Sequence, residues 1–284
     1  MRNENLVSVC MITYNHEKYI RQAIESVLMQ KTDFTIELII GEDCSTDHTR
    51  NIAKEYAKNY PEIIYAQFPR ENRGMVNNFF TVLQSAKGKY IAMCEGDDYW
   101  TDPYKLQKQV DFLEANPEYG MVSSDINLID ENGETMPDNN MVLRQRASYK
   151  PTVDFFDLLK TNQINTLTVC ARADLMKELA VRVQKENLWF IYDYWFWLNI
   201  SLKSKIRVFD EKMANYRVHS AGISRQKNFF KVKKHLIHKY ILFEALKQKR
   251  LNKQQFFKKY ISLLYRILRS RNTEALAYVI KLKK

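Results

Sequence analysis

Three carboxylates are crowded into the four residues Glu95-Gly96-Asp97-Asp98, directly after the apolar run at residues 90–94. Negative charges this close destabilise one another unless a cation or hydrogen-bond donors neutralise them. A divalent ion such as Mg²⁺ or Mn²⁺ would do so, because these ions prefer oxygen ligands and commonly bridge protein carboxylates to phosphates. Acidic turns that simply begin a helix are also common. The spacing alone therefore leaves both interpretations open.

Two other polar clusters also follow apolar runs. Thr13-Tyr14-Asn15 ends the first apolar run of the chain, and Glu42-Asp43 ends the second. Side-chain oxygens at these places could hydrogen-bond to the base or ribose of a nucleotide. For Asp43 the sequence that follows, Ser-Thr-Asp, is equally typical of a plain helix N-terminus.

Three isolated residues could complete such a site. Arg73, in a turn before Gly74, would bring a cation near a phosphate. His219 follows a short apolar run and could bind a metal, although a lone His is more often structural. Asp193 precedes four aromatic residues. A carboxylate among aromatics can have a raised pKa and act as a general base, but it could equally be the N-cap of a helix.

Alternating strands and helices must position these residues. Apolar, β-branched runs predict strands, and apolar residues at three- and four-residue spacing predict the helices between them. This alternation indicates an α/β fold with a mostly parallel sheet flanked by helices, in which ligands bind beyond the carboxyl ends of the strands. The three polar clusters fall at those ends. The predicted strands are 6–12, 36–40, 63–68 and 90–94, and the predicted helices are 16–30, one from Ser45-Thr46-Asp47 to about Asn59, and 76–86.

The second half of the chain has a less regular pattern. We predict a helix from Asp102-Pro103, a strand and hairpin around Glu131-Asn132-Gly133, and a polar loop or flap at 136–149. Further on we predict a strand at 166–171, an aromatic-rich helix at 193–202 and a short strand at 213–218. We expect residues 1–100 to form a nucleotide-binding half and residues 101–224 an acceptor half of one catalytic domain.

The net charge of +11 is not spread evenly along the chain. Residues 225–284 hold 18 Lys and Arg against two acidic residues, whereas residues 1–224 hold 26 basic and 31 acidic residues. This contrast predicts an acidic globular body followed by a basic, helical tail. The tail carries an apolar stripe at helical spacing. Either it packs on the body, or it contacts anionic lipid. The stripe comprises Phe256, Phe257, Tyr260, Ile261, Leu264, Ile267 and Leu268.

The four cysteines, Cys10, Cys44, Cys94 and Cys170, lie far apart and without the spacing of a zinc site. Buried, reduced thiols are therefore expected. The N-terminus does not resemble a signal peptide, and no apolar run approaches the ~18 residues of a membrane span. We expect a cytoplasmic protein that does not cross a membrane but can lie peripherally on its inner face.

Taken in order, six segments resemble those of the family-2 glycosyltransferases, which have the A-type glycosyltransferase fold. The resemblance runs from Val7 to about Arg225. Glu42 and Glu95 occupy places where the family usually has Asp, and Cys44 a place where it usually has Gly. The segments are VSVCMITYNHEKYIRQAIESVLMQ, GEDCSTDHT, ENRG, GKYIAMCEGDDYWTDPYKLQKQVDFLEANPE, IYDYWFWL and YRVHSAGIS.

The resemblance implies roles for individual residues. Asp193 would be the catalytic base that removes the proton of the acceptor hydroxyl. The divalent metal, Mn²⁺ or Mg²⁺, would be held by Asp97, Asp98 and His219. The nucleotide-binding residues would be Thr13, Tyr14, Asn15, Glu42, Asp43, Arg73, Glu95 and Asp97.

These roles describe an inverting glycosyltransferase that moves a sugar from a nucleotide-sugar donor, a UDP-sugar, to a hydroxyl of a glycan or lipid-linked glycan. The absence of GxGxxG and GxxxxGK[ST] motifs argues against dinucleotide-dependent oxidoreductases and P-loop enzymes. The alternative is a noncatalytic protein that binds nucleic acid or membrane through its basic tail. We expect no nucleic-acid partner, because the excess charge is confined to that tail.

Overall fold

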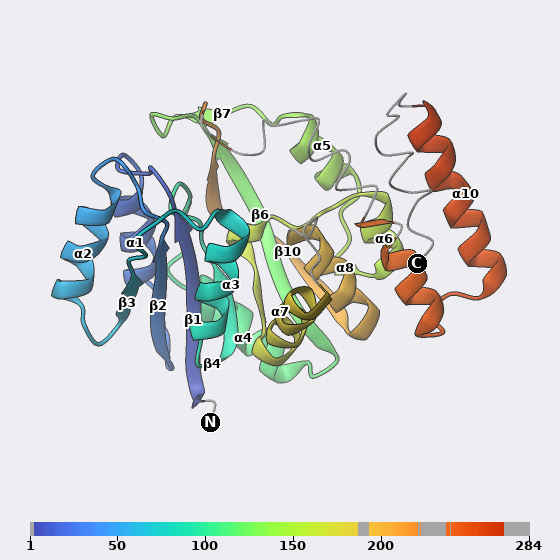
Figure 1. The fold of residues 1–284 in the computed structure, drawn as a ribbon, viewed down its shortest axis with the longest axis horizontal. Coiled ribbons are helices and arrows are strands. Elements are labelled where there is room, and N and C mark those ends of the chain that lie inside the picture. Colours follow the sequence, from blue (N-terminus) through green and yellow to red (C-terminus); the bar gives the residue numbers. More distant parts are fainter. Residues whose placement is uncertain (1–2, 187–192, 221, 223–236, 239, 270–284) are drawn as a thin grey trace.

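The fold is described from a computed structural model, for residues 3–186, 193–220, 222, 237–238 and 240–269. One mixed sheet runs through the molecule, with the strand order β3-β2-β1-β4-β9-β6-β10-β5 (Figure 1). Two short strands lie off this path, β7 beside β6 and β8 beside β10. The predicted α/β class, with a large central sheet and flanking helices, is confirmed.

The first half of the chain forms the parallel part of the sheet. Strands β1, β2, β3 and β4 pair only in parallel with one another. Helix α1 shows why the intervening segments are helical, since Ile20, Ala23, Ile24 and Val27 recur on one face and are all buried. The bounds are β1 Asn3–Thr13, α1 Ile20–Leu28, β2 Thr35–Glu42, α2 Thr49–Asn59, β3 Ile64–Gln67, α3 Met75–Ser85 and β4 Gly88–Met93.

The second half adds strands of both directions. The short β9 runs antiparallel between β4 and β6, and the long β10 then pairs in parallel with β6. The bounds are β5 Tyr99–Trp100, α4 Lys105–Ala115, β6 Tyr119–Ile129, β7 Thr135–Met136, α5 Asn140–Ala147, β8 Thr152–Val153, α6 Phe155–Lys160, the 3₁₀ helix η1 Thr166–Thr168, β9 Cys170–Arg172, α7 Ala173–Glu186, α8 Asp193–Lys203, β10 Lys205–Arg217 and α10 Lys253–Arg269.

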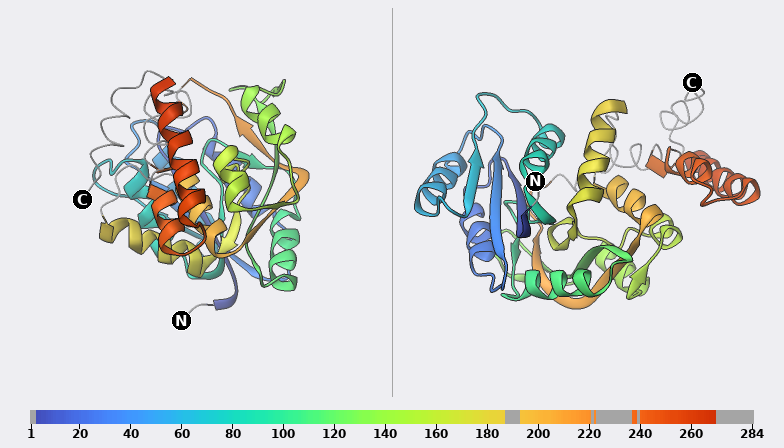
Figure 2. Two further views of the ribbon diagram at one scale, coloured as in Figure 1. Left: turned by 90° about the vertical axis from the view of Figure 1, so that its right-hand side faces the viewer. Right: turned by 90° about the horizontal axis from the view of Figure 1, so that it is seen from below.

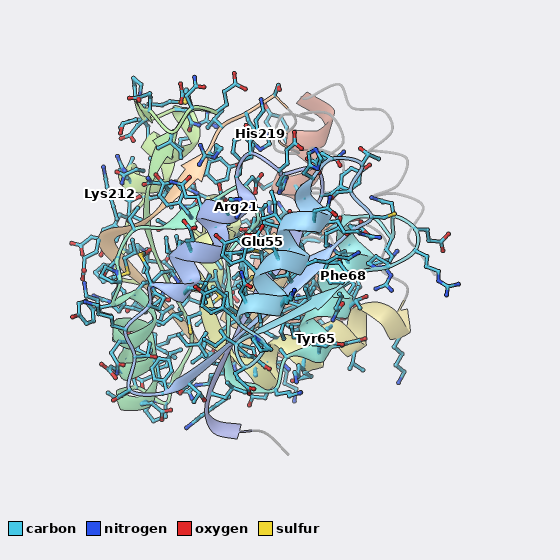
Figure 3. The ribbon with its side chains drawn as sticks, turned by 90° about the vertical axis from the view of Figure 1, so that its left-hand side faces the viewer. Arg21, Glu55, Tyr65, Phe68, Lys212 and His219 are labelled. Carbon is cyan, nitrogen blue, oxygen red and sulfur yellow. The ribbon has the colours of Figure 1, made fainter. Side chains whose placement is uncertain are left out.

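Helices cover both faces of the sheet. One buried cluster joins the sheet to α1, α2 and α4, and a second joins it to α3, α6, α7 and α8. The helices of the first layer are also linked at the surface. Arg21 of α1 and Glu55 of α2 face each other in Figure 3 and form two hydrogen bonds, of 2.8 and 3.2 Å. The carboxyl ends of β1, β2 and β4 are left open between the layers.

Two segments differ from their predicted structure. The polar segment 136–149, expected to be a loop, contains helix α5. Tertiary contacts explain the difference, because Val142 is fully buried and Arg146 forms an ion pair with Asp125 of β6. The predicted strand at 166–171 is divided between η1 and β9, with β9 pairing to both β4 and β6.

The C-terminal part of the described chain is helical, as expected. Ile237, Ile241 and Leu263 belong to the same buried cluster as α7 and α8, so this part packs on the body. Helix α10 lies at the opposite end of the molecule from α2 and β3 (Figures 1 and 2). No helix among the described residues is long and apolar enough to cross a membrane.

The predicted apolar stripe of the tail is split between two faces of α10. Phe256 and Tyr260 stack on each other and contact Phe243. Phe257 and Ile261 point to solvent and are 63% and 50% exposed. The side chains of Leu264, Ile267 and Leu268 lie outside the described residues.

Candidate active site

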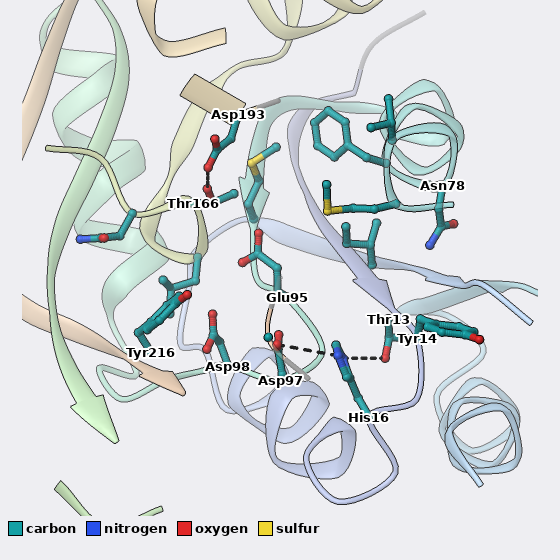
Figure 4. A pocket seen from close by; sticks show the side chains of 18 of the residues that line it. Thr13, Tyr14, His16, Asn78, Glu95, Asp97, Asp98, Thr166, Asp193 and Tyr216 are labelled. Atoms are coloured by element: carbon teal, nitrogen blue, oxygen red, sulfur yellow. Dashed lines mark hydrogen bonds and ion pairs between the residues drawn. The ribbon is translucent and has the colours of Figure 1, made fainter. Parts of the chain in front are cut away.

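The predicted polar clusters converge on one cavity of about 740 Å³ at the carboxyl ends of β1 and β4 (Figure 4). Its walls come from distant parts of the chain, including α3, η1, α8 and the end of β10. The sequence-predicted residues on the wall are Thr13, Tyr14, Asn15, Asp43, Glu95, Asp97, Asp98 and Asp193.

A glycine lets the ends of β1 and β4 come together. The N–H of Gly96 donates to the carbonyl oxygen of Ile12 at 3.1 Å. A Cβ at position 96 would lie only 2.6 Å from Oγ1 of Thr13 and 3.2 Å from Nδ1 of His16. Any larger residue would therefore push apart the two strand ends that carry the acidic motif and His16.

Asp97 lies between two histidines. Its Oδ2 is 2.9 Å from Nε2 of His219 and 3.7 Å from Nε2 of His16. Nδ1 of His16 is in turn 3.2 Å from the hydroxyl of Thr13, which orients the ring so that Nε2 faces Asp97. All three ligand atoms lie within 4.8 Å of one another. The cluster brings together the ends of β1, β4 and β10.

The electrostatics of this cluster suit a divalent cation. Burial disfavours ionisation of the Asp97 carboxyl, but the hydrogen bond with His219 and the nearby His16 ring outweigh it and lower its pKa. Burial lowers the pKa of His16, which keeps the ring neutral and its lone pair available. Carboxylate oxygens and imidazole nitrogens are suitable ligands for Mn²⁺ and similar metals. The donor set therefore fits the metal implied by the sequence resemblance.

The other two carboxyls of the acidic motif have different surroundings. Oδ1 of Asp98 accepts a 2.7 Å hydrogen bond from the backbone N–H of Arg217. Burial, together with Asp97 and Glu95, raises the pKa of Asp98 well above its usual value. Burial, with Asp97 and Asp193 nearby, raises the pKa of Glu95 to about 8. Asp98 thus supports the end of β10 and does not join the two histidines.

Glu95 reaches into the cavity between the Asp97 cluster and Asp193 (Figure 4). Its Oε2 is buried and has no hydrogen-bond partner among the described residues. A buried polar atom is rarely left unpaired. With its raised pKa, a protonated Glu95 can donate a hydrogen bond to a hydroxyl of a bound molecule.

Asp193 lies at the far end of the cavity, at the start of α8. The hydroxyl of Thr166 donates a short hydrogen bond to its Oδ2, and the N–H of Tyr194 donates to Oδ1 at 2.5 Å. Burial raises the pKa of Asp193, although these two bonds lower it in part. A carboxylate with a raised pKa, held in a fixed orientation beside a cavity, can act as a general base.

At the edge of the cavity beside the ends of β1 and β2, Asp43 and Tyr14 lie on the wall. Oδ1 of Asp43 accepts a 2.8 Å hydrogen bond from the backbone N–H of Arg73. Arg73 meets Asp43 through its backbone, and its exposed side chain is not part of the wall. Tyr14 is 44% exposed, and its ring could stack on a base.

Glu42 and Asn15 hold the loops of this edge together. Both oxygens of Glu42 are engaged, one by the N–H of Ser45 at 2.6 Å and one by Arg50 at 2.5 Å. Its side chain is fully buried, does not line the cavity and here positions the loop, so its contact with a nucleotide stays a prediction. Oδ1 of Asn15 accepts from the N–H of Thr46 at 2.9 Å.

Sequence reasoning missed His16 and Thr166. His16 was predicted only as the first residue of a helix, yet it directly follows the polar cluster that ends the first strand. A second histidine at such a strand end, like His219, was the available signal. Nothing in the sequence pointed to Thr166, because its partner Asp193 is 27 residues away.

Comparison with known proteins agrees with this geometry. Residues 8–181 match the Glycosyl transferase family 2 domain. The chain is 35% identical over 218 residues to an uncharacterized protein of Mycobacterium tuberculosis, covering 76% of this chain and 60% of that relative. It is 30% identical over 225 residues to the putative teichuronic acid biosynthesis glycosyltransferase TuaG of Bacillus subtilis, covering 78% of this chain and 82% of TuaG. The chain thus spans less than two thirds of the mycobacterial relative.

Solved structures share the fold at low sequence identity. Residues 1–349 of S. aureus TarS in complex with UDP-GlcNAc superpose with a TM-score of 0.68 at 20% identity, covering 100% of this chain and 77% of that structure. The mannosyltransferase PcManGT from Pyrobaculum calidifontis, in complex with GDP-Man and Mn²⁺, gives a TM-score of 0.55 at 16% identity, covering 96% and 78%. From its matched domain and its fold, the chain belongs to glycosyltransferase family 2 and has the A-type glycosyltransferase fold.

Proposed function

We propose that the protein is an inverting glycosyltransferase that transfers a sugar from a UDP-sugar to a hydroxyl of a glycan or lipid-linked glycan. One observation carries the proposal. A single cavity has an ionised carboxylate between two imidazoles at one end and an oriented carboxyl with a raised pKa at the other. The first end suits a metal-bound diphosphate, and the second suits an acceptor hydroxyl.

Asp97, His16 and His219 would hold the divalent metal, Mn²⁺ or Mg²⁺. When bound, the metal would offset the negative charge that grows on the departing diphosphate. Asp98, one of the expected ligands, would act indirectly by fixing the backbone of Arg217 two residues before His219. Thr13 would hold the His16 ring in its ligating orientation.

Asp193 would take the proton from the acceptor hydroxyl. The acceptor oxygen would then attack the anomeric carbon from the side opposite the diphosphate, forming the new glycosidic bond while the bond from that carbon to the diphosphate oxygen breaks. The products are the glycosylated acceptor and UDP. A single displacement inverts the anomeric configuration and requires no covalent enzyme intermediate.

The donor would lie along the Tyr14–Asp43 edge, with Glu95 beneath its ribose or sugar. The choice of UDP is supported by the neighbour with the higher TM-score, which was determined with UDP-GlcNAc, whereas the more distant PcManGT was determined with GDP-Man. TuaG is described as a teichuronic acid biosynthesis enzyme, which supports a glycan acceptor.

The basic tail would bring the enzyme to an anionic membrane surface, where a lipid-linked acceptor would be found. Helix α10 presents Phe257, Ile261 and Tyr265 to solvent at four-residue spacing, and these side chains are 50–63% exposed. In the sequence, residues 225–284 carry 18 Lys and Arg. Apolar side chains combined with positive charge are typical of surfaces that bind anionic lipid.

A donor screen tests the proposed function. The purified chain would be incubated with UDP-GlcNAc, UDP-GalNAc, UDP-glucose, UDP-galactose and GDP-mannose, with and without Mn²⁺, and release of UDP or GDP measured. We expect Mn²⁺-dependent hydrolysis of at least one UDP-sugar, with water as the acceptor. Nucleotide release from none of the donors, together with no binding of UDP in Mn²⁺, would reject the enzymatic reading in favour of a noncatalytic binding protein.

A further inference from the structure

A buried lysine at the start of α4 has no carboxylate partner among the described residues. Lys105, at the start of α4, is 0% exposed. Its ammonium lies 4.1 Å from the centre of the Trp100 ring and donates a 2.8 Å hydrogen bond to Oε1 of Gln109. Burying an ammonium is strongly unfavourable, and an apolar side chain of the same length would avoid that cost. The position of Lys105 therefore calls for an explanation beyond packing.

The lysine fixes the orientation of Gln109. An ammonium can only donate, so it requires the carbonyl oxygen of the glutamine amide to face it. The amide NH₂ must then point the other way, and Nε2 donates to the carbonyl oxygen of Thr168 at 2.8 Å. Trp100, which carries Lys105 on its face, donates from Nε1 to the carbonyl oxygen of Leu167 at 2.7 Å.

Both accepting carbonyls belong to η1, the turn that contains Thr166. A 3₁₀ turn has weaker internal hydrogen bonding than an α-helix, so bonds from outside it largely determine its position. Within η1 the closing bond runs from the N–H of Val169 to the carbonyl oxygen of Thr166, at 3.0 Å. The hydroxyl of the same Thr166 donates to Asp193.

We infer that Lys105, Gln109 and Trp100 are positioning residues that orient Asp193 through η1. None of the three lines the cavity, so each acts at a distance from the substrate. The inference rests on the proposed role of Asp193 as the base. In this role the buried ammonium of Lys105 fixes the amide of Gln109 so that its NH₂ donates to the carbonyl oxygen of Thr168.

The test uses substitutions that remove one hydrogen-bond donor and keep the packing. Gln109→Glu keeps the size and still attracts Lys105, but it places an oxygen against the carbonyl of Thr168. Trp100→Phe keeps a ring face for Lys105 and removes the bond to Leu167. We expect kcat for hydrolysis of the fastest UDP-sugar of the panel to fall about 10–100-fold, since a misplacement of about 1 Å can cost 10²-fold. KM for that donor and the Kd of UDP with Mn²⁺ should stay within twofold.

Gln107→Glu is the matched control. It makes the same substitution on the same helix, at a position that contacts Asp111 and the N–H of Asp33 rather than η1. Its kcat should equal that of the wild type. If Gln109→Glu does not fold, Trp100→Phe alone decides the outcome.

A double-mutant comparison separates positioning from general support of the fold. In a Thr166→Val background the link to Asp193 is already cut, so Gln109→Glu should lower kcat no further. An equal loss in both backgrounds, or a parallel loss of UDP affinity, would overturn the inference. Asp193→Asn is measured beside them. Wild-type turnover in that variant would instead reject the base assignment, so the two failures are distinguishable.

Discussion

At one end of the cavity Asp97 lies between the imidazoles of His16 and His219, and at the other end Asp193 accepts hydrogen bonds from the hydroxyl of Thr166 and the N–H of Tyr194. Burial disfavours the ionised form of both carboxyls, yet the pKa of Asp97 is lowered and that of Asp193 is raised. The difference comes from the neighbours, because His16 and His219 stabilise an anion and the surroundings of Asp193 do so only in part. One chemical group is thereby suited to holding a cation in one place and to accepting a proton in another.

The largest expected effect comes from breaking the Asp97 end. Asp97→Asn removes the charge between the two imidazoles, so we expect no measurable turnover and loss of Mn²⁺-dependent UDP binding. Chelation of divalent ions should silence the wild type in the same way. Titration calorimetry with UDP and Mn²⁺ measures the binding, and nucleotide release measures the turnover.

His16→Ala shows whether the cluster was correctly identified. Because Nε2 of His16 faces Asp97, removing the imidazole should weaken Mn²⁺ binding at least ~10-fold. Even the loss of a residue that only supports a metal ligand typically lowers metal affinity by that factor. The exposed His48→Ala serves as a control and should bind Mn²⁺ as the wild type does. If Asp97→Asn keeps full activity even in excess chelator, the Asp97 end of the cavity does not hold a metal.

Breaking the Asp193 end should have a smaller effect. Asp193→Asn keeps the shape and the hydrogen bonds but cannot accept a proton, so transfer should fall by roughly 10²–10⁴-fold. The affinity for UDP with Mn²⁺ should not change, because the residue lies at the acceptor end. The exposed Asp111→Asn controls for the loss of a charge. A parallel fall in UDP affinity would show that Asp193 serves only as a structural cap of α8.

The pH dependence sharpens the contrast between the two carboxyls. Asp193 acts as a base only when ionised, so kcat should fall as the pH drops through its raised pKa. The Thr166 hydrogen bond lowers that pKa, and Thr166→Val should therefore shift the acidic limb of the profile to higher pH. The profile is measured with saturating UDP-sugar and Mn²⁺ between pH 5 and pH 9. If the acidic limb of the profile does not move in Thr166→Val, that limb does not report the ionisation of Asp193.

The smallest expected effect on chemistry comes from the tail. Ile237 and Leu263 belong to the core, so point variants are preferable to truncation. Replacing Phe257, Ile261 and Tyr265 together by Ser should weaken binding to phosphatidylserine vesicles and leave UDP hydrolysis unchanged. Wild-type binding should weaken with salt without vanishing, since each basic residue contributes ~1 kcal/mol of screened attraction and the apolar face is unaffected by salt.

Tyr65→Ser provides the control for the tail. Tyr65 is 59% exposed and lies on β3, at the far end of the molecule from α10 (Figures 1 and 3). Its loss should not change vesicle binding. Equal binding of the wild type to neutral and anionic vesicles would contradict the charge-based attraction. A steep salt dependence together with tight binding to RNA would favour nucleic acid as the partner.

The sequence predicted the regular half of the molecule well. Apolar runs predicted β1, β2 and β4, and apolar residues at helical spacing predicted the helices between them, because each element buries a continuous apolar face. Helix α5 was not predictable in this way. Only half of its residues are apolar, and it is stabilised by a tertiary ion pair between Arg146 and Asp125.

Within the site, the positions of the strand ends predicted the acidic motif but not the different partners of its carboxyls. Asp97 and Asp98 are adjacent in sequence, and only the fold turns one toward His219 and the other toward the backbone of Arg217. The link from Thr166 to Asp193 likewise depends on the packing of η1 against α8. No local sequence pattern predicts these contacts. Cys44, which stands where the family usually has Gly, has a φ of +60°, a backbone conformation that favours glycine.

The placement of the four cysteines makes the natural chain a convenient reporter. Burial raises the pKa of Cys10 and of Cys170 to about 12 and that of Cys94 well above its usual value, so these thiols will resist alkylation in the native state. Cys44 is half-buried and follows Asp43, which lines the cavity at the proposed donor site. A maleimide fluorophore should therefore label position 44 selectively, and its emission should respond when a nucleotide arrives, with no engineered residue in the chain.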